Sequence, residues 1–166
     1  MNNTQSSKYT IWLNLTLVAC VVFFLCCLMG DIFAYPFCEH WWDAYLFNTA
    51  FAKIIPALEK SATRFNVFLT CFYLSTALTY PIIFCVVGLI RNIKKDKIFE
   101  RANTRLMSII SLCCFLICVI CTIGAIACYA LAVIALVGLF VGLIVQCVRL
   151  VMDRAIDMRD ELDLTV

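Results

Sequence analysis

Charged residues are scarce in this chain of 166 residues. They make up 14% of the sequence, whereas a typical soluble domain contains about 25%. Hydrophobic residues make up 64%, against about 45–50% in soluble domains. The net charge is only +2, so the chain lacks the basic excess of a nucleic-acid-binding protein. This balance indicates an integral membrane protein that binds no nucleic acid directly.

Groups suited to acid–base catalysis are scarce as well. The only histidine is His40, and no phosphate-binding loop, Ser/His/Asp set or paired carboxylates lies within an apolar run. No acid or base inside a span marks an ion path. Cys38, His40 and Asp43 lie close together, but a structural zinc site requires four ligands. Because acid–base chemistry relies on histidine or tuned carboxylates, we expect no enzyme, no cofactor and no bound metal.

Long apolar runs, in contrast, are abundant. A membrane-spanning helix needs about 20 apolar residues, and four runs reach that length, at residues 11–33, 65–90, 106–127 and 130–152. We therefore predict an all-α integral membrane protein with four transmembrane helices in a single domain, residues 1–166.

The longest segment between two predicted spans is residues 34–64. Trp41, Trp42 and Tyr45 suit a membrane interface, where aromatic rings anchor. Apolar residues further along this segment recur at roughly helical spacing. We expect an outer loop that contains an interfacial helix, broken near Pro56.

Basic residues concentrate in residues 91–105, which hold six of them against Asp96 and Glu100. The positive-inside rule places this loop in the cytoplasm, so both termini are expected there too. Residues 153–166 form an acidic tail, which we expect to continue the fourth helix and to dock on the basic loop. The residues expected to bind a partner are Lys94, Lys95, Lys97, Asp160, Glu161 and Asp163.

Small residues recur at helical spacing in the last two spans. In the third span they follow one another at intervals of three and four, and in the fourth span Gly138 and Gly142 form a GxxxG motif. Small residues let helices approach closely in lipid. We expect an antiparallel helix pair, with a homodimer through the GxxxG face as the alternative. The packing residues are Ser111, Cys114, Cys118, Cys121, Ala125, Cys128, Ala135, Gly138 and Gly142.

The chain holds twelve cysteines, and all except Cys38 lie in or beside apolar runs. A buried cysteine behaves as a small hydrophobic residue, so we expect packing roles. Cys118 and Cys121 form a CxxC motif, which leaves a membrane thiol oxidoreductase as one alternative function. Apolar surroundings disfavour the thiolate that such chemistry requires.

Two parts of the sequence carry a family resemblance. They are the series Phe99, Asn103, Arg105 and Leu106 before the third span, and the ending at residues 155–166. With the four-span layout, they resemble the bacterial membrane family called domain of unknown function 2975. The family has no agreed activity, and its genes often lie beside a small helix-turn-helix regulator. The resemblance implies a regulatory membrane protein and supplies no catalytic residues.

These observations lead to one preferred function and several alternatives. We expect a multi-pass protein of the bacterial plasma membrane that engages a cytosolic partner, such as a small helix-turn-helix regulator, through its inner loop and tail. A thiol oxidoreductase, a transporter-like protein and an immunity protein against membrane-active peptides remain open.

Overall fold

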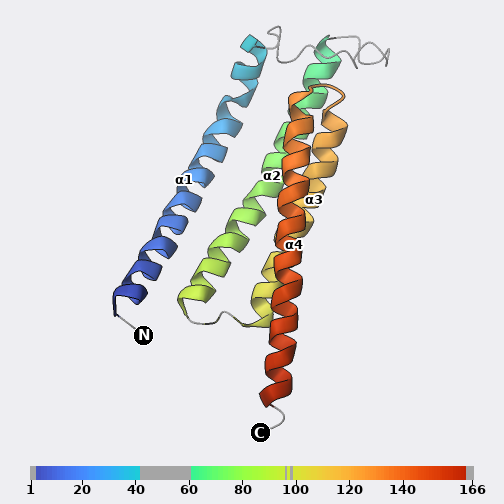
Figure 1. Ribbon diagram of the computed structural model, residues 1–166. Helices are drawn as coiled ribbons and strands as arrows, with labels where there is room; N and C mark the ends of the chain where they lie inside the picture. The colour runs from blue at the N-terminus through green and yellow to red at the C-terminus, as the bar shows by residue number, and fades with distance from the viewer. Residues whose placement is uncertain (1–2, 42–60, 96, 98, 164–166) are drawn as a thin grey trace.

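The described part of the chain, residues 3–41, 61–95, 97 and 99–163, forms four long helices in the computed structural model (Figure 1). Each helix contains a segment that is long and apolar enough to cross a membrane. The predicted all-α fold with four candidate membrane spans is therefore confirmed. The helices are α1 (Asn3–Trp41), α2 (Ser61–Lys94), α3 (Arg101–Gly124) and α4 (Ala130–Asp163).

Helices that follow one another in sequence pack together in space. The main contacts join α1 to α2, α2 to α3, and α3 to α4. Only 6% of the most apolar window of α1 is buried, whereas the corresponding share in α3 is 28%. The packed part of the molecule therefore consists of α2, α3 and α4, and α1 joins it chiefly along α2.

The bundle has two distinct ends. We call the end where residues 95–100 connect α2 to α3 the basic end, and the end where residues 125–129 connect α3 to α4 the turn end. The first residues of α1 and the last residues of α4 both lie at the basic end (Figure 1). There α4 extends beyond the other three helices.

The predicted outer loop is helical at both of its borders. Residues 34–41 extend α1 through Pro36 to Trp41, and residues 61–64 begin α2. Apolar residues continue on both sides of Pro36, and transmembrane helices tolerate a proline. The interfacial helix that we expected near Pro56 lies outside the described residues.

The third helix ends earlier than its predicted span, at Gly124. Residues 125–129 then form a tight turn, in which the backbone N–H groups of Ala127 and Cys128 donate to the Gly124 carbonyl at 2.9 and 3.1 Å. Such bonds use carbonyls that the end of a helix leaves unpaired. Ala125 and Cys128, which we placed on the third span, therefore lie in the turn.

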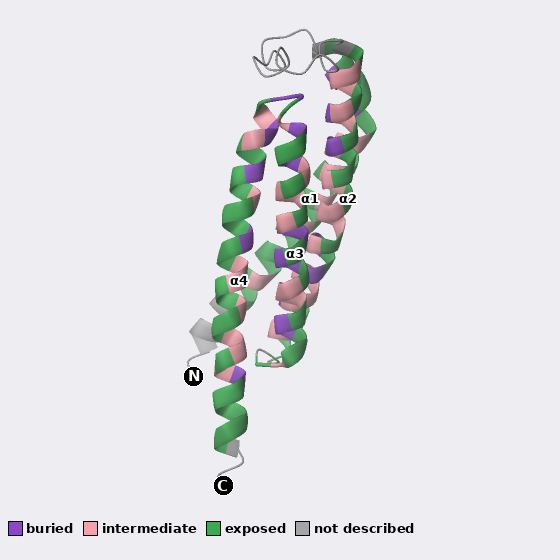
Figure 2. Cartoon of the chain, turned by 90° about the vertical axis from the view of Figure 1, so that its right-hand side faces the viewer, coloured by how far each residue is buried: buried purple, intermediate pink, exposed green. Residues whose placement is uncertain are grey.

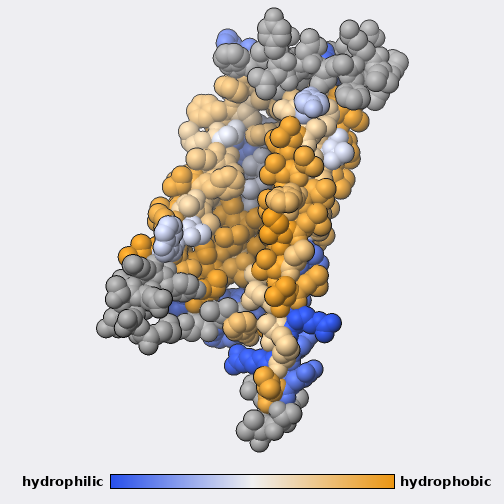
Figure 3. Space-filling view, in the orientation of Figure 1, coloured by the Kyte–Doolittle hydropathy of each residue, from blue (hydrophilic) through white to orange (hydrophobic). Residues whose placement is uncertain are grey.

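Two clusters of buried side chains hold the helices together. One lies toward the turn end and includes Cys121 and Leu131. The other lies nearer the basic end and joins Cys85 of α2 to Ile110 and Cys114 of α3. The buried positions follow the facing sides of the helices in Figure 2. On the face shown in Figure 3, apolar side chains predominate along the helices, and hydrophilic ones gather at the basic end beside α4. This is the distribution that a lipid environment requires.

Candidate functional site

A buried asparagine holds the connection between α2 and α3. Asn103, in the first turn of α3, is only 1% exposed. Its Oδ1 accepts a hydrogen bond of 2.7 Å from Nδ2 of Asn92, and its Nδ2 donates one of 2.7 Å to the backbone carbonyl of Lys97. A buried polar group is costly unless it is hydrogen-bonded. These bonds therefore fix the basic loop against the start of α3.

The three lysines that we expected to bind a partner lie around this loop. Lys94 donates to Oδ1 of Asn14 in α1 at 2.5 Å, and Lys97 forms an ion pair of 3.0 Å with Glu100. Lys95 is exposed. Within the described residues, none of these lysines forms an ion pair with an acid of the tail.

Arg101, the first residue of α3, makes the contact between the loop and the tail. Its Nη2 lies 3.3 Å from Oδ1 of Asp157 and 3.2 Å from Oδ2 of Asp160, on successive turns of α4. All three side chains are more than half exposed, so each pair contributes about 0–1 kcal/mol. Glu161 is exposed, and the Asp163 side chain lies outside the described residues. The tail thus docks on the loop region through an arginine that we did not single out.

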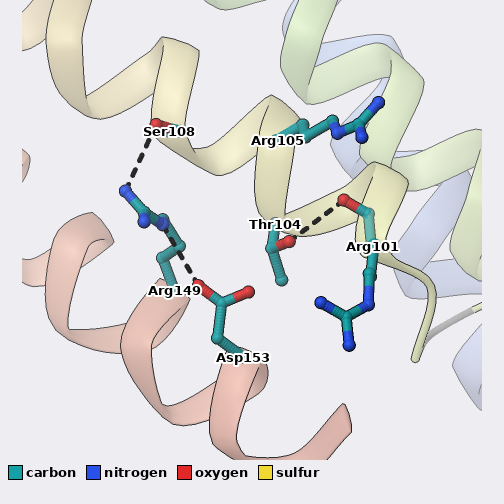
Figure 4. Close-up of a pocket in the computed structure, with 6 residues that line it drawn as sticks. All are labelled: Arg101, Thr104, Arg105, Ser108, Arg149 and Asp153. Carbon is teal, nitrogen blue, oxygen red and sulfur yellow. Dashed lines mark hydrogen bonds and ion pairs between the residues drawn. The ribbon is translucent and has the colours of Figure 1, made fainter. Parts of the chain in front are cut away.

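A cavity of about 270 Å³ lies beside this contact, between α3 and α4 (Figure 4). Arg149 of α4 reaches across toward α3, where its Nη1 donates to the Ser108 hydroxyl at 3.2 Å. Its Nε pairs with Oδ2 of Asp153 at 3.4 Å. The residues that line the cavity are Arg101, Thr104, Arg105, Ser108, Arg149 and Asp153.

Hydrogen-bond donors dominate this cavity. In Figure 4 the guanidinium groups of Arg101 and Arg149 lie on either side of Thr104, and that of Arg105 points away from Arg149. Three arginines and two hydroxyl groups line the cavity with a single carboxylate, that of Asp153. Guanidinium groups bind anionic oxygens strongly. The arrangement can therefore bind an anion.

The small residues that we expected to pack belong to two contacts. In one, the Ser111 hydroxyl donates to the backbone carbonyl of Gly142 at 3.2 Å. A Cβ added at Gly142 would lie 3.2 Å from the Cβ of Cys114, so α3 and α4 approach closely here. In the other, the Cys121 sulfur lies 3.5 Å from the Ser75 hydroxyl of α2. The small residues of α3 thus face both of its neighbours.

Other members of this set line a groove of about 250 Å³ between α3 and α4, which is mainly apolar. Cys118, Ala125 and Ala135 contribute to it. A Cβ at Gly138 would lie 3.7 Å from a backbone carbonyl of α3. The GxxxG face is thus covered by α3 within one chain. A homodimer through this face stays a prediction, and it would require α3 to move away from Gly142.

None of the twelve cysteines, all within the described residues, belongs to a disulfide. Cys121 is only 1% exposed, and burial raises the pKa of the Cys128 thiol in the turn. Within the described residues no group of three or more His, Cys, Asp or Glu side chains is placed to hold a metal, and Asp43 lies outside them. An oxidoreductase role for Cys118 and Cys121 stays a prediction, as do the transporter-like and immunity functions.

An acid inside a candidate span is a feature that sequence reasoning missed. Asp31 lies within α1, in the span Thr10–His40. Its Oδ2 accepts a hydrogen bond of 2.6 Å from the Tyr80 hydroxyl, and its backbone carbonyl accepts one of 3.2 Å from Tyr73. Its Oδ1 is buried without a hydrogen-bond partner. The expectation that no acid or base inside a span marks an ion path left out Asp31, which lies in the predicted span at residues 11–33. The seven-residue spacing of the two tyrosines, which places them on one face of α2, was the available signal.

Comparison with known proteins identifies one family. A family model described as "Protein of unknown function (DUF2975)" matches residues 9–166. The match includes all four candidate spans. No curated protein and no solved structure matches the chain.

Proposed function

This chain belongs to the DUF2975 family, and we propose that it is a regulatory or interaction protein of the cell membrane. In this proposal a soluble cytosolic protein binds at the basic end, on the part of α4 that extends beyond the bundle. The first candidate partner is a small helix-turn-helix regulator, which the family resemblance suggests.

The observation that carries the proposal is the length of α4. The helix continues through the tail to Asp163, so residues 151–163 add about 20 Å of helix at 1.5 Å per residue. Figure 1 shows this part extending past the α2–α3 connection. One side of this length packs on the bundle, where Ile156 is only 4% exposed. The side that carries Met158 is exposed, and a binding protein would cover it.

The side chains of this extension suit recognition in a groove. Met158 and Leu162, one turn apart, are 58% and 68% exposed. Exposed acids, among them Asp157 and Glu161, flank them. An amphipathic helix is commonly bound with its apolar side chains in a groove. A matching partner would have an apolar groove bordered by basic residues.

The Arg101 ion pairs would assist such binding by holding the helix in place beforehand. Arg101 ties Asp157 and Asp160 to the start of α3, on the side of α4 away from Met158. A binding element that is already ordered loses less conformational entropy when its partner binds. The extension would therefore be presented in one orientation.

The charge distribution supports a cytosolic partner. Residues 91–105 hold six basic residues and two acids, and such loops are retained in the cytoplasm. The α4 extension lies at the same end of the bundle (Figure 1).

The test is crosslinking in native membranes with a tagged full-length chain, followed by mass spectrometry of the captured proteins. We expect the double variant Met158→Asp/Leu162→Asp to lose at least 90% of a soluble partner that the unmodified chain captures, an estimate based on two contacts of about 1–2 kcal/mol each. The matched control is Ala102→Asp, which adds an acid at the same end, on α3. Equal capture by the double variant and the control would refute the proposal.

A further inference from the structure

We call the cavity lined by Arg101, Arg105 and Arg149 the arginine cavity. Its depth in the membrane follows from the lengths of α3 and α4. Thr104 lies 20 residues before Gly124 at the end of α3, which corresponds to about 30 Å at 1.5 Å per residue. Arg149 lies 19 residues after Ala130 at the start of α4, again about 30 Å. The hydrocarbon core of a bilayer is about 30 Å thick. With the turn end at one surface, both helices place the cavity at the level of the opposite headgroups.

The chemistry of the cavity matches a phosphate group. Arg149 lies with its Nη1 on the Ser108 hydroxyl and its Nε on Asp153, so its guanidinium is held in place before any ligand arrives. Arg105 adds a further cation, and Thr104 adds a hydroxyl. Arg101 also lines the cavity, while its Nη2 pairs with Asp157 and Asp160. Arginine binds phosphate oxygens through paired N–H donors. The Asp153 carboxylate faces the same cavity and is paired with Arg149, which reduces its repulsion of an anion.

The apolar groove opens on the same side of the α3–α4 pair as the cavity. Thr104 in the cavity and Thr122 in the groove are 18 residues apart on α3. Asp153 and Ala135 are also 18 residues apart on α4. Eighteen residues make five complete turns, so the members of each pair lie on the same face of their helix.

We propose that this face of the α3–α4 pair binds an anionic phospholipid. Its phosphate occupies the arginine cavity, and one acyl chain follows the helix pair toward the apolar groove. Leu139, at the groove, lies ten residues from Arg149, which is about 15 Å along α4. One leaflet contributes half of the hydrocarbon core, also about 15 Å, so an acyl chain reaches the groove. Free phosphate shares the headgroup chemistry, but it would make no use of the groove.

The test measures binding to the full-length chain in detergent by native mass spectrometry. The probes are phosphatidylglycerol with acyl chains long enough to cross one leaflet, about 15 Å, phosphatidylcholine of equal chain length, and inorganic phosphate. We expect phosphatidylglycerol to bind at least about tenfold more weakly to Arg149→Gln, since a hydrogen bond to a charged group contributes about 1.5–3 kcal/mol. The matched control Arg154→Gln removes an exposed arginine of α4 outside the cavity and should change the affinity less than twofold.

Two further variants separate the possible outcomes. Arg105→Gln removes an exposed side chain, and it tests the cavity if Arg149→Gln folds poorly. We expect phosphatidylglycerol to bind this variant about threefold more weakly. The loss is smaller than for Arg149→Gln because the Arg105 guanidinium points away from Arg149. Leu139→Trp narrows the end of the groove that lies about 15 Å from Arg149, and it should weaken the binding of the lipid but not that of inorganic phosphate. The lipid proposal is overturned if inorganic phosphate displaces the lipid and Leu139→Trp has no effect. Equal binding of phosphatidylglycerol by Arg149→Gln, Arg105→Gln and Arg154→Gln would overturn the site itself.

Discussion

Asn103 shows how one buried amide side chain can hold the connection between α2 and α3 in place. It accepts a hydrogen bond from Asn92 and donates one to the carbonyl of Lys97. Asn103→Ala removes both bonds and leaves those two groups with fewer partners in a partly buried place. We expect a loss of stability of about 1–3 kcal/mol, measured as a lower unfolding midpoint in detergent.

The control for this change is Asn66→Ala on α2. Asn66 is exposed, so its loss should alter the midpoint by an amount within about 0.5 kcal/mol. If the two variants were equally stable, Asn103 would not anchor the connection.

Asp31 illustrates at the same scale how an acid is accommodated in an apolar helix. The Tyr80 hydroxyl donates to its carboxylate, and the Phe24 ring packs edge-on against the Tyr80 ring at 5.5 Å. Hydrogen bonds reduce the cost of burying a polar group. α1 therefore continues past Asp31, where an unpaired acid would favour leaving the membrane.

At the scale of helices, the close approach of α2, α3 and α4 depends on glycine at Gly124. A Cβ there would lie 2.6 Å from Cδ1 of Leu131 and 3.0 Å from the Cβ of Cys71. Leu131 can rotate away, but the Cβ of Cys71 moves only with its helix. We expect Gly124→Ala to destabilise the bundle by about 1–3 kcal/mol, measured by unfolding in detergent.

The matched control is Gly30→Ala in α1, where a Cβ meets nothing within 4 Å. Alanine is favoured over glycine in a helix by about 1 kcal/mol, so this variant should be as stable as the unmodified chain or more so. A Gly124→Ala protein with the stability of Gly30→Ala would show that the helices adjust without cost.

The whole molecule predicts an orientation in the membrane. The basic loop, the start of α1 and the end of α4 share one end of the bundle (Figure 1), and the positive-inside rule assigns that end to the cytoplasm. Alkaline phosphatase fused after the last residue should therefore be inactive, and a fluorescent protein fused there should fluoresce. Phosphatase fused after Tyr129, in the turn, should be active.

The opposite pattern of phosphatase activity would contradict the predicted orientation. Replacing Lys94, Lys95 and Lys97 with glutamine should weaken the orientation signal, because it removes half of the six cations in residues 91–105. Part of the phosphatase fused at the C-terminus should then become active.

The whole molecule also shows why the helix ends were the least predictable feature. The end of α3 at Gly124 depends on hydrogen bonds within the turn, and α1 continues beyond its predicted span through Pro36. Hydropathy responds to the composition of about 20 residues at a time. It does not register the backbone bonds that end a helix or let it continue.

The sequence by itself determined the four candidate membrane helices and the family, because these depend on long apolar runs and on local motifs such as the ending at residues 155–166. It also predicted contact between the basic loop region and the acidic tail. Only the tertiary structure decided which polar groups meet: Arg101 with Asp157 and Asp160, and Asp31 with Tyr80. The physical reason is that hydropathy is nearly uniform around helices surrounded by lipid. How each helix is rotated toward its neighbour is therefore set by close packing and by a few hydrogen bonds between residues far apart in the chain.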